Sequence, residues 1–314
     1  MRLESATIDR DAHGGSKGQV WAVLAGCWAL SGCVHGIEEQ QSRAGDLLRD
    51  CVVPAPAGVA ELGAPSALEY PDGSLWIWSS VALVGGQVVY NVSAFLDDAA
   101  ALCASGVRLH GAGDLPRSLL QLDAAELVAN TERDDGRALR LEPSGGFVEA
   151  GVGYLFYDHV LTGPGVFDAQ SLGTGLCRIE ERDGACERLR PGGNSILWPP
   201  ESRSLNRGGL VADDRAWVLG CRSVAAFSDV CTLSGAPLDG LETPASYQLW
   251  SAFGGWVDDE RQASAVLEQG GAVTLSRFDG KYAAFSLDVF ASRFQVRLSA
   301  PPPTSARSLM SVTI

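Results

Sequence analysis

Two cysteines close a repeated motif near the start of the chain, in the sequence LAGCWALSGC at residues 24–33. In both copies a leucine, a small residue and a glycine precede the thiol. This arrangement resembles the bacterial lipobox, in which the cysteine sulfur is acylated before the leader is cleaved. The apolar run follows a basic residue, Lys17, and is too short to span a bilayer, as is typical of an export signal. The motif therefore predicts an exported protein held by a lipid.

The length of the apolar run distinguishes the two cysteines. Cleavage before Cys27 leaves about six apolar residues, whereas cleavage before Cys33 leaves about a dozen, within the ~7–15 that export signals use. We expect residues 1–32 to be a lipoprotein signal peptide, Cys33 to carry the lipid and residues 33–60 to form a tether. The membrane partner is then reached through the N-terminal lipid. The predicted location is the cell envelope, with the outer membrane or cell surface favoured. An ordinary secretory signal without lipid is the alternative.

Six cysteines remain after Cys33, an even number that suits disulfides in an oxidising compartment. They are Cys51, Cys103, Cys177, Cys186, Cys221 and Cys231. Proximity in sequence favours Cys177–Cys186 and Cys221–Cys231, and Cys51–Cys103 follows by remainder, although other pairings stay open. No Cys-x-x-Cys spacing is present, so metal binding by these thiols is not expected.

Charge and composition exclude some classes of function. The chain carries a formal net charge of −14, and 46% of its 314 residues are hydrophobic. Nucleic-acid binding requires a basic surface, so we expect no nucleic-acid partner. The apolar content predicts a folded globular chain.

Four segments share one form, in which a turn precedes an aromatic or branched strand. They are DGSLWIWSS at 72–80, GVGYLFYDHV at 151–160, DDRAWVLGC at 213–221 and DGKYAAFSL at 279–287. Helical periodicity is nearly absent outside residues 118–130, so the pattern predicts an all-β chain. Radial repetition of four-stranded sheets protects the sheet edges, which favours a β-propeller over residues 61–314. A large β-sandwich is the alternative.

The order of several phrases between Gly153 and Arg307 carries a resemblance. The phrases include YLFYDHVLTGPG, GTGLCRIE, LVADDRAWVLGC and ASYQLWSAFGGWVDD. This half of the chain resembles a family of secreted bacterial proteins of unknown function with a five-bladed propeller, which is similar in fold to arabinanases, xylosidases and related glycoside hydrolases. Only 33 residues follow Lys281, less than one repeat. A five-bladed ring closed by residues 51–70 and a four-bladed or incomplete ring therefore both stay open.

The resemblance implies where catalytic acids would lie. Glycoside hydrolysis needs two carboxyl groups that flank the scissile bond, and the related hydrolases place acids on the innermost strand of successive blades. The corresponding segments here are 65–70, 139–149, 202–211 and 271–278. The first two contain Glu69, Glu142 and Glu149, and the last two contain no acid. The usual set of three acids is therefore incomplete, and a hydrolase would have to use Glu142 with Asp158 or Asp168.

Arginine and tryptophan suggest binding instead of cleavage. Asn206, Arg207 and Arg277 stand where acids are missing, and guanidinium groups bind carboxylate or sulfate. Trp250 and Trp256 could stack on sugar rings, with packing between blades as the structural alternative. We therefore expect a non-catalytic glycan-binding or scaffold protein. A glycoside hydrolase and a protein-interaction lipoprotein are the alternatives.

Other motifs give no support for a cofactor. The histidines after the leader, His35, His110 and His159, lack zinc-type spacing, and no phosphate loop or dinucleotide-binding motif occurs. Pairs of aspartates at predicted turns, such as 213–214, lack the spacing of a calcium-binding EF-hand loop. We expect no cofactor and no metal, and calcium binding has no support.

Overall fold

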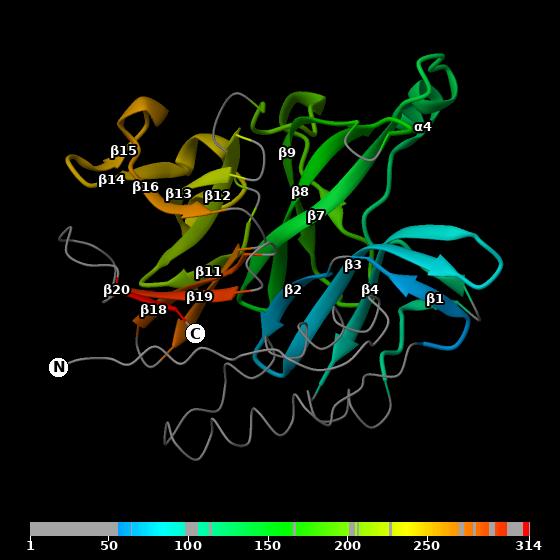
Figure 1. The fold of residues 1–314 in the computed structure, drawn as a ribbon, viewed down its shortest axis with the longest axis horizontal. Helices are drawn as coiled ribbons and strands as arrows, with labels where there is room; N and C mark the ends of the chain where they lie inside the picture. Colours follow the sequence, from blue (N-terminus) through cyan, green and yellow to red (C-terminus); the bar gives the residue numbers. More distant parts are fainter. Residues whose placement is uncertain are drawn as a thin grey trace.

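The computed structural model (Figure 1) is built almost entirely of antiparallel sheets. It describes residues 56–63, 65–97, 106–112, 115–165, 168–200, 205, 207–225, 228–269, 273–278, 281–288, 293–299 and 310–313. The predicted signal peptide, the acylation site Cys33, most of the tether, and Cys51 and Cys103 lie outside these residues. Among the described helices, none is long and apolar enough to cross a membrane.

Four sheets follow one another along the chain. The first contains β1 (Val59–Leu62), β2 (Pro65–Tyr70), β3 (Gly73–Leu83) and β4 (Val88–Leu96). The second contains β7 (Ala138–Glu149), β8 (Val152–Thr162), β9 (Ala169–Ile179) and β10 (Glu187–Arg188). The third contains β11 (Gly209–Ala212), β12 (Arg215–Ala225), β13 (Ser228–Pro237), β14 (Gln248–Ser251), β15 (Gly255–Val257) and β16 (Ala265–Gln269). The fourth contains β17 (Val273–Phe278), β18 (Lys281–Asp288), β19 (Arg293–Ser299) and β20 (Met310–Thr313).

Smaller elements connect the sheets. A two-stranded ribbon of β5 (Gly111–Ala112) and β6 (Leu115–Pro116) precedes the helix α4 (Ala124–Thr131). Short 3₁₀ turns occur at Pro191–Gly193, Leu238–Gly240, Pro244–Ser246 and Glu260–Gln262. The helix predicted within residues 118–130 is thus confirmed over part of that range.

One strand of each sheet lies at the hub of the fold, namely β2, β7, β11 and β17. β7 contacts β2 on one side and β11 on the other, and β11 also contacts β17. The aromatic segments predicted from sequence are β3, β8, β12 and β18, the second strands in their sheets. The fold is therefore the predicted all-β propeller, with the four sheets as blades.

Residues 51–70 do not complete the last blade, although ring closure by these residues was one of the alternatives from sequence. The described C-terminal residues complete it, because β20 pairs with β19. The N-terminal strands β1 and β2 instead pair with one edge of β3, β1 opposite residues 81–83 and β2 opposite residues 73–78. The described part of residues 51–70 therefore belongs to the first blade, and the described chain forms four blades.

Two apolar cores separate the first three blades. Side chains alternate along β8, with Leu155 and Tyr157 in the core shared with the first blade and Phe156 in the core shared with the third. Tyr247 of the third blade packs edge-on against Phe156 and donates a hydrogen bond from its hydroxyl to the carbonyl of Leu241 at 2.9 Å. Each such side chain contributes about 1.5–3 kcal/mol by burial. The second blade is therefore held on both faces.

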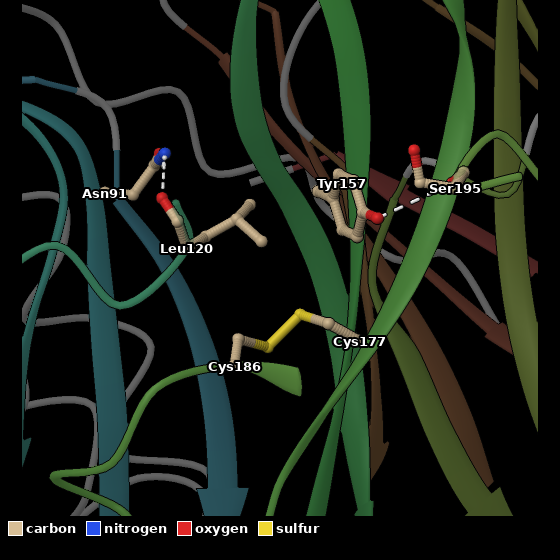
Figure 2. Close-up of a disulfide and its surroundings, with 6 residues drawn as sticks. All are labelled: Asn91, Leu120, Tyr157, Cys177, Cys186 and Ser195. Carbon is tan, nitrogen blue, oxygen red and sulfur yellow. Dashed lines mark hydrogen bonds between the residues drawn. A yellow bond between two sulfur atoms is a disulfide. The ribbon is translucent and has the colours of Figure 1, made fainter. Parts of the chain in front are cut away.

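Asn91 joins β4 to the second blade, and Figure 2 shows its other contact, with Leu120. It is buried and has φ +57°, a left-handed conformation that asparagine tolerates better than most residues. Its Nδ2 donates to the carbonyls of Leu120 at 3.1 Å and Leu141 at 2.9 Å. Because Leu141 belongs to β7, this one side chain links the outer strand of the first blade to the first strand of the next.

The helix α4 is held by charges instead of burial. Asp123 and Glu126 form a capping box, in which each carboxylate accepts the other residue's backbone N–H. None of its residues is buried. Arg188, whose side chain is only 4% exposed, donates to both carboxylates and fixes the helix start against β10.

Two of the predicted disulfides are confirmed. Cys177–Cys186 joins the end of β9 to the chain before β10, and Cys221–Cys231 joins opposed residues of β12 and β13. Figure 2 shows the first of them between the first two blades. Each closes a short hairpin, as the spacing predicted.

The loop closed by Cys177–Cys186 reaches the first blade through Arg182. The guanidinium lies over the rings of Phe95 at 4.3 Å and Tyr70 at 4.8 Å. It also forms two hydrogen bonds with the carboxylate of Asp72, one of them 2.7 Å long, which lowers the pKa of that carboxyl. This stacked and bidentate contact is called the Arg182 clamp below.

The same loop also contacts two other regions. Arg178 donates to Glu242 of the third blade at 3.2 Å. The backbone N–H of Cys186 donates to the carbonyl of Leu119, in the segment before α4, at 2.8 Å. The stapled loop therefore connects the second blade to three separate parts of the fold.

The two disulfides make a matched pair for a stability test. They join residues 9 and 10 positions apart, so the loop-closure entropy of each is worth about 2.5–3 kcal/mol. Replacing both Cys177 and Cys186 by alanine should lower the free energy of unfolding by more than the same replacement at Cys221 and Cys231. The reason is that the first loop also positions the Arg182 clamp. Urea unfolding of both double variants measures the difference, and equal losses would contradict this role.

Candidate functional site at the hub

Two carboxyl residues predicted from sequence lie directly opposite each other on neighbouring strands. Glu142 of β7 pairs in register with Asp158 of β8, and Asp158 pairs with Thr174 of β9. Directly opposed residues have Cβ atoms about 4.5–5.5 Å apart on the same face of a sheet. Thr174 Oγ1 donates a hydrogen bond to Asp158 Oδ1 at 2.8 Å. Glu142, Asp158 and Thr174 therefore form one row, called the carboxyl row below.

The carboxyl row lies beside the place where three blades meet. A β-bulge follows Glu142, between Pro143 and Gly145. Ser66 of β2 donates to the Pro143 carbonyl at 3.2 Å. On the other side, a Cβ at Gly145 would come within 2.8 Å of the Arg207 backbone, and its φ of +151° also suits glycine. The bulge therefore brings β7 close to both neighbouring blades next to the row.

Two features of its surroundings raise the pKa of Glu142. Burial raises the pKa of the Glu142 carboxyl above its ordinary value, and the negative charge of Asp158 raises it further. Arg140 acts in the opposite direction, and its guanidinium also lies over the Tyr90 ring at 4.6 Å. The side chain of Glu142 keeps access to solvent, and Asp158 is half-buried. The row can therefore reach a ligand.

Arg207 lies on the neighbouring third blade, just before β11. Its Nη2 is 3.8 Å from Asp229 Oδ2 of β13, in an ion pair that is mostly shielded from solvent. The guanidinium of Arg207 is therefore engaged with a carboxylate of its own blade. The side chain of Arg277, on β17, lies outside the described residues, and so does the whole of Asn206.

Asp168 and His159 are not part of the carboxyl row. Asp168 forms an ion pair with Arg137 at 2.7 Å, beyond the pair of Thr162 and Ala169 at the far end of β8. His159 follows Asp158 and so points to the other face of the sheet, where it is buried against the Tyr157 ring at 5.3 Å. Burial lowers its imidazole pKa.

The two tryptophans predicted to bind glycan lie at the outer edge of the third blade. Trp250 of β14 is opposed to Trp256 of β15. Trp256 packs on Trp217 with ring centroids 5.2 Å apart, and Arg215 lies over it at 4.9 Å. Trp217 belongs to the same blade as Trp256, so this contact lies within a blade and is not the packing between blades that was the alternative. The structure does not bring the pair together with Arg207 at the hub.

Thr174 is a residue of the row that sequence reasoning missed. It lies in the GTGLC stretch, without any motif, and only the register of β8 and β9 places it against Asp158. No group of three metal-ligating side chains occurs within the described part of the chain.

Comparisons with known proteins concern the fold. No family model and no curated protein matches this chain. A candidate hydrolase from Bacteroides ovatus ATCC 8483 matches with a TM-score of 0.52 and 9% identity, over 83% of this chain and 71% of that one. The fold is a β-propeller related to that of this hydrolase.

Two carbohydrate-active enzymes also match. The GH43_1 enzyme from Xanthomonas citri, complexed with xylose, has a TM-score of 0.49 and 12% identity over 85% of this propeller and 78% of that chain. An α-L-arabinofuranosidase from Clostridium thermocellum ATCC 27405 has a TM-score of 0.45 and 15% identity, over 83% and 75%.

The opposition of Glu142 and Asp158 can be tested by titration. Asp158→Asn removes the like charge, so it should lower the pKa of Glu142 toward its ordinary value, as measured by carboxyl NMR chemical shifts. Asp168→Asn is the matched control, because Asp168 is paired with Arg137 away from the row. A Glu142 pKa that does not respond to Asp158→Asn would contradict the close opposition of the two carboxyls.

Stability should depend on the same group. The folded chain holds the Glu142 proton more tightly than the unfolded chain does, so stability falls as pH rises through the ordinary glutamate pKa of about 4.3. Glu142→Gln should therefore raise the free energy of unfolding at neutral pH and leave it unchanged well below about pH 4. Urea unfolding across this pH range measures the effect.

Proposed function

We propose that the protein is a lipid-anchored protein of the cell envelope whose hub binds a glycan without cleaving it. The LSGC motif ending at Cys33 supports the lipid anchor and the location. The fold relation to a hydrolase supports a ligand site at the hub. The two carbohydrate-active enzymes reported above suggest glycan as the class of ligand.

The observation that carries the proposal is the placement of both hub carboxyls on one sheet. Glu142 and Asp158 are opposed on adjacent strands, so both approach a ligand from the same side. Glycoside cleavage instead requires two carboxyl groups on either side of the scissile bond. On the neighbouring third blade Arg207 is paired with Asp229. A row of two carboxyls and a threonine hydroxyl can accept and donate hydrogen bonds to sugar hydroxyls.

A second candidate function is glycoside hydrolysis with Glu142 as the proton donor. Its raised pKa favours this reading, since a general acid must hold its proton near the working pH. Asp158 would then stay ionised as the second carboxyl. The two candidates use the same residues, so they differ in turnover and not in location.

Binding is tested on a glycan array, and the positive glycans are then measured by calorimetry. Glu142→Gln and Asp158→Asn should each weaken binding about tenfold, because each removes a charge-assisted hydrogen bond worth about 1.5 kcal/mol. Asp168→Asn should leave the affinity unchanged. Glycan binding that is indifferent to both row variants would place the ligand elsewhere, and silence on the array would favour a protein-interaction role.

Turnover separates the two candidates. The wild-type protein should release no product from aryl glycosides or polysaccharides. Product release by the wild type that Glu142→Gln abolishes would overturn the binding proposal in favour of the hydrolase.

A further inference from the structure

Large apolar side chains are exposed around the turn between β3 and β4. Val84, in the turn itself, is 74% exposed, and Val88 at the start of β4 is 43% exposed. Leu115 of the β5–β6 ribbon is 57% exposed. These three residues are called the apolar tip below. Single exposed aliphatic side chains are ordinary on protein surfaces, but a group of them marks a surface that another phase or partner covers.

A groove lies beside the hairpin end, and Leu115 of the apolar tip lines it. It has a volume of about 480 Å³ and lies between Gln87 and Val89 on one side and residues 115–118 with Gln121 on the other. Leu115 is therefore next to the hairpin end in space, although 27 residues separate it from Val88. Val88 precedes Val89 in β4, so its side chain points to the opposite face of the strand from the groove. The apolar tip therefore presents side chains on both faces of the hairpin end.

The chain enters the folded domain at the apolar tip. The N–H of Val84 donates to the carbonyl of Gly58 at 2.8 Å, only two residues after the first described residue, Pro56. Residues 34–55 separate Pro56 from the predicted acylated Cys33. Twenty-two residues span at most about 79 Å when fully extended, so the attachment point of the tether limits how far this end can lie from a bilayer.

The protein has a formal net charge of −14, and an anionic lipid surface repels acidic faces. Beside the apolar tip, the exposed charged residues Glu61 of β1 and Arg117 of the groove have opposite signs. A lipid surface would therefore meet little repulsion here.

We propose that the apolar tip rests on the lipid bilayer, with Val84, Val88 and Leu115 at the boundary between headgroups and acyl chains. This inference depends on the lipid anchor of the proposed function. Aliphatic side chains on a protein surface add to the membrane affinity of a lipid chain, because stable attachment takes more than one signal. The contact would also orient the domain, since the tether and the apolar tip hold the same end of the first blade.

Carbene footprinting of the acylated full-length mature protein tests this contact. The protein is reconstituted in vesicles of phosphatidylethanolamine and phosphatidylglycerol and compared with the same chain made without leader and lipid. Labelling of residues 83–88 and 115–117 should fall several-fold on the vesicles. Phe253, which is 98% exposed between β14 and β15, is the internal control. Its labelling should stay unchanged, because that hairpin lies at the far side of the molecule from β1 (Figure 1).

A matched pair of variants checks that the protection belongs to the apolar tip. Val84→Asp combined with Leu115→Asp should restore labelling of the tip peptides while the protein stays on the vesicles through its lipid. Phe253→Asp should leave the protection intact. Val84, Leu115 and Phe253 are all exposed to solvent, so neither variant should disturb folding.

The mass of the N-terminal peptide separates the two ways of failing. If Cys33 carries acyl chains but the tip is labelled equally with and without vesicles, the anchor stands and the inference about the tip is wrong. If Cys33 carries no acyl chain, the anchor and the inference both fail. If the tip peptides are labelled as weakly without vesicles as with them, the tip is covered by protein and the inference is overturned.

Discussion

A sheet that is apolar on both faces needs a neighbour on each side, and this requirement determines the arrangement of the blades. In β8 successive side chains go to different cores, Leu155 and Tyr157 to one and Phe156 to the other. Within the described residues no helix covers either face, and other sheets exclude water from them. The second blade therefore packs between the first and the third, and β2, β7 and β11 are brought together at the hub, where the carboxyl row lies.

The contacts between blades at the surface are weak one by one. Exposed ion pairs contribute about 0–1 kcal/mol, and a guanidinium over an aromatic ring adds about 0.5–1 kcal/mol at an exposed site. The loop that carries Arg178 and Arg182 makes several of them from one stapled segment. Because the disulfide restricts the loop before these contacts form, less conformational entropy is lost when Arg182 stacks between Asp72 and the rings of the first blade.

The sequence was informative where the signal is local. Turn residues followed by aromatic strands located β3, β8, β12 and β18, and the hairpin cysteines were paired by their spacing alone. The pairing of β1 and β2 with one edge of β3 could not be foreseen, since no local pattern says which strand two short segments share. The sequence therefore left open which blade contains residues 51–70.

The carboxyl row could be predicted from sequence only in part, for a different reason. Glu142 and Asp158 were both candidates, but their opposition depends on strand register, and a bulge beside Glu142 shifts that register by one residue. Thr174 carried no motif at all. Trp250 and Trp256 illustrate the reverse case, because residue type suggested a sugar platform while topology placed them in the outermost strands of their sheet. Distance from the hub is a property of strand order, which side-chain chemistry does not encode.

Each blade is an unbroken stretch of chain, and both described disulfides join partners within a single hairpin. A thiol in such a hairpin meets its partner by local diffusion, long before the ring is complete. Blades can consequently mature in order of synthesis, with each finished sheet serving as the template surface for the next. Oxidation then proceeds without the reshuffling of mispaired bonds that distant cysteines require.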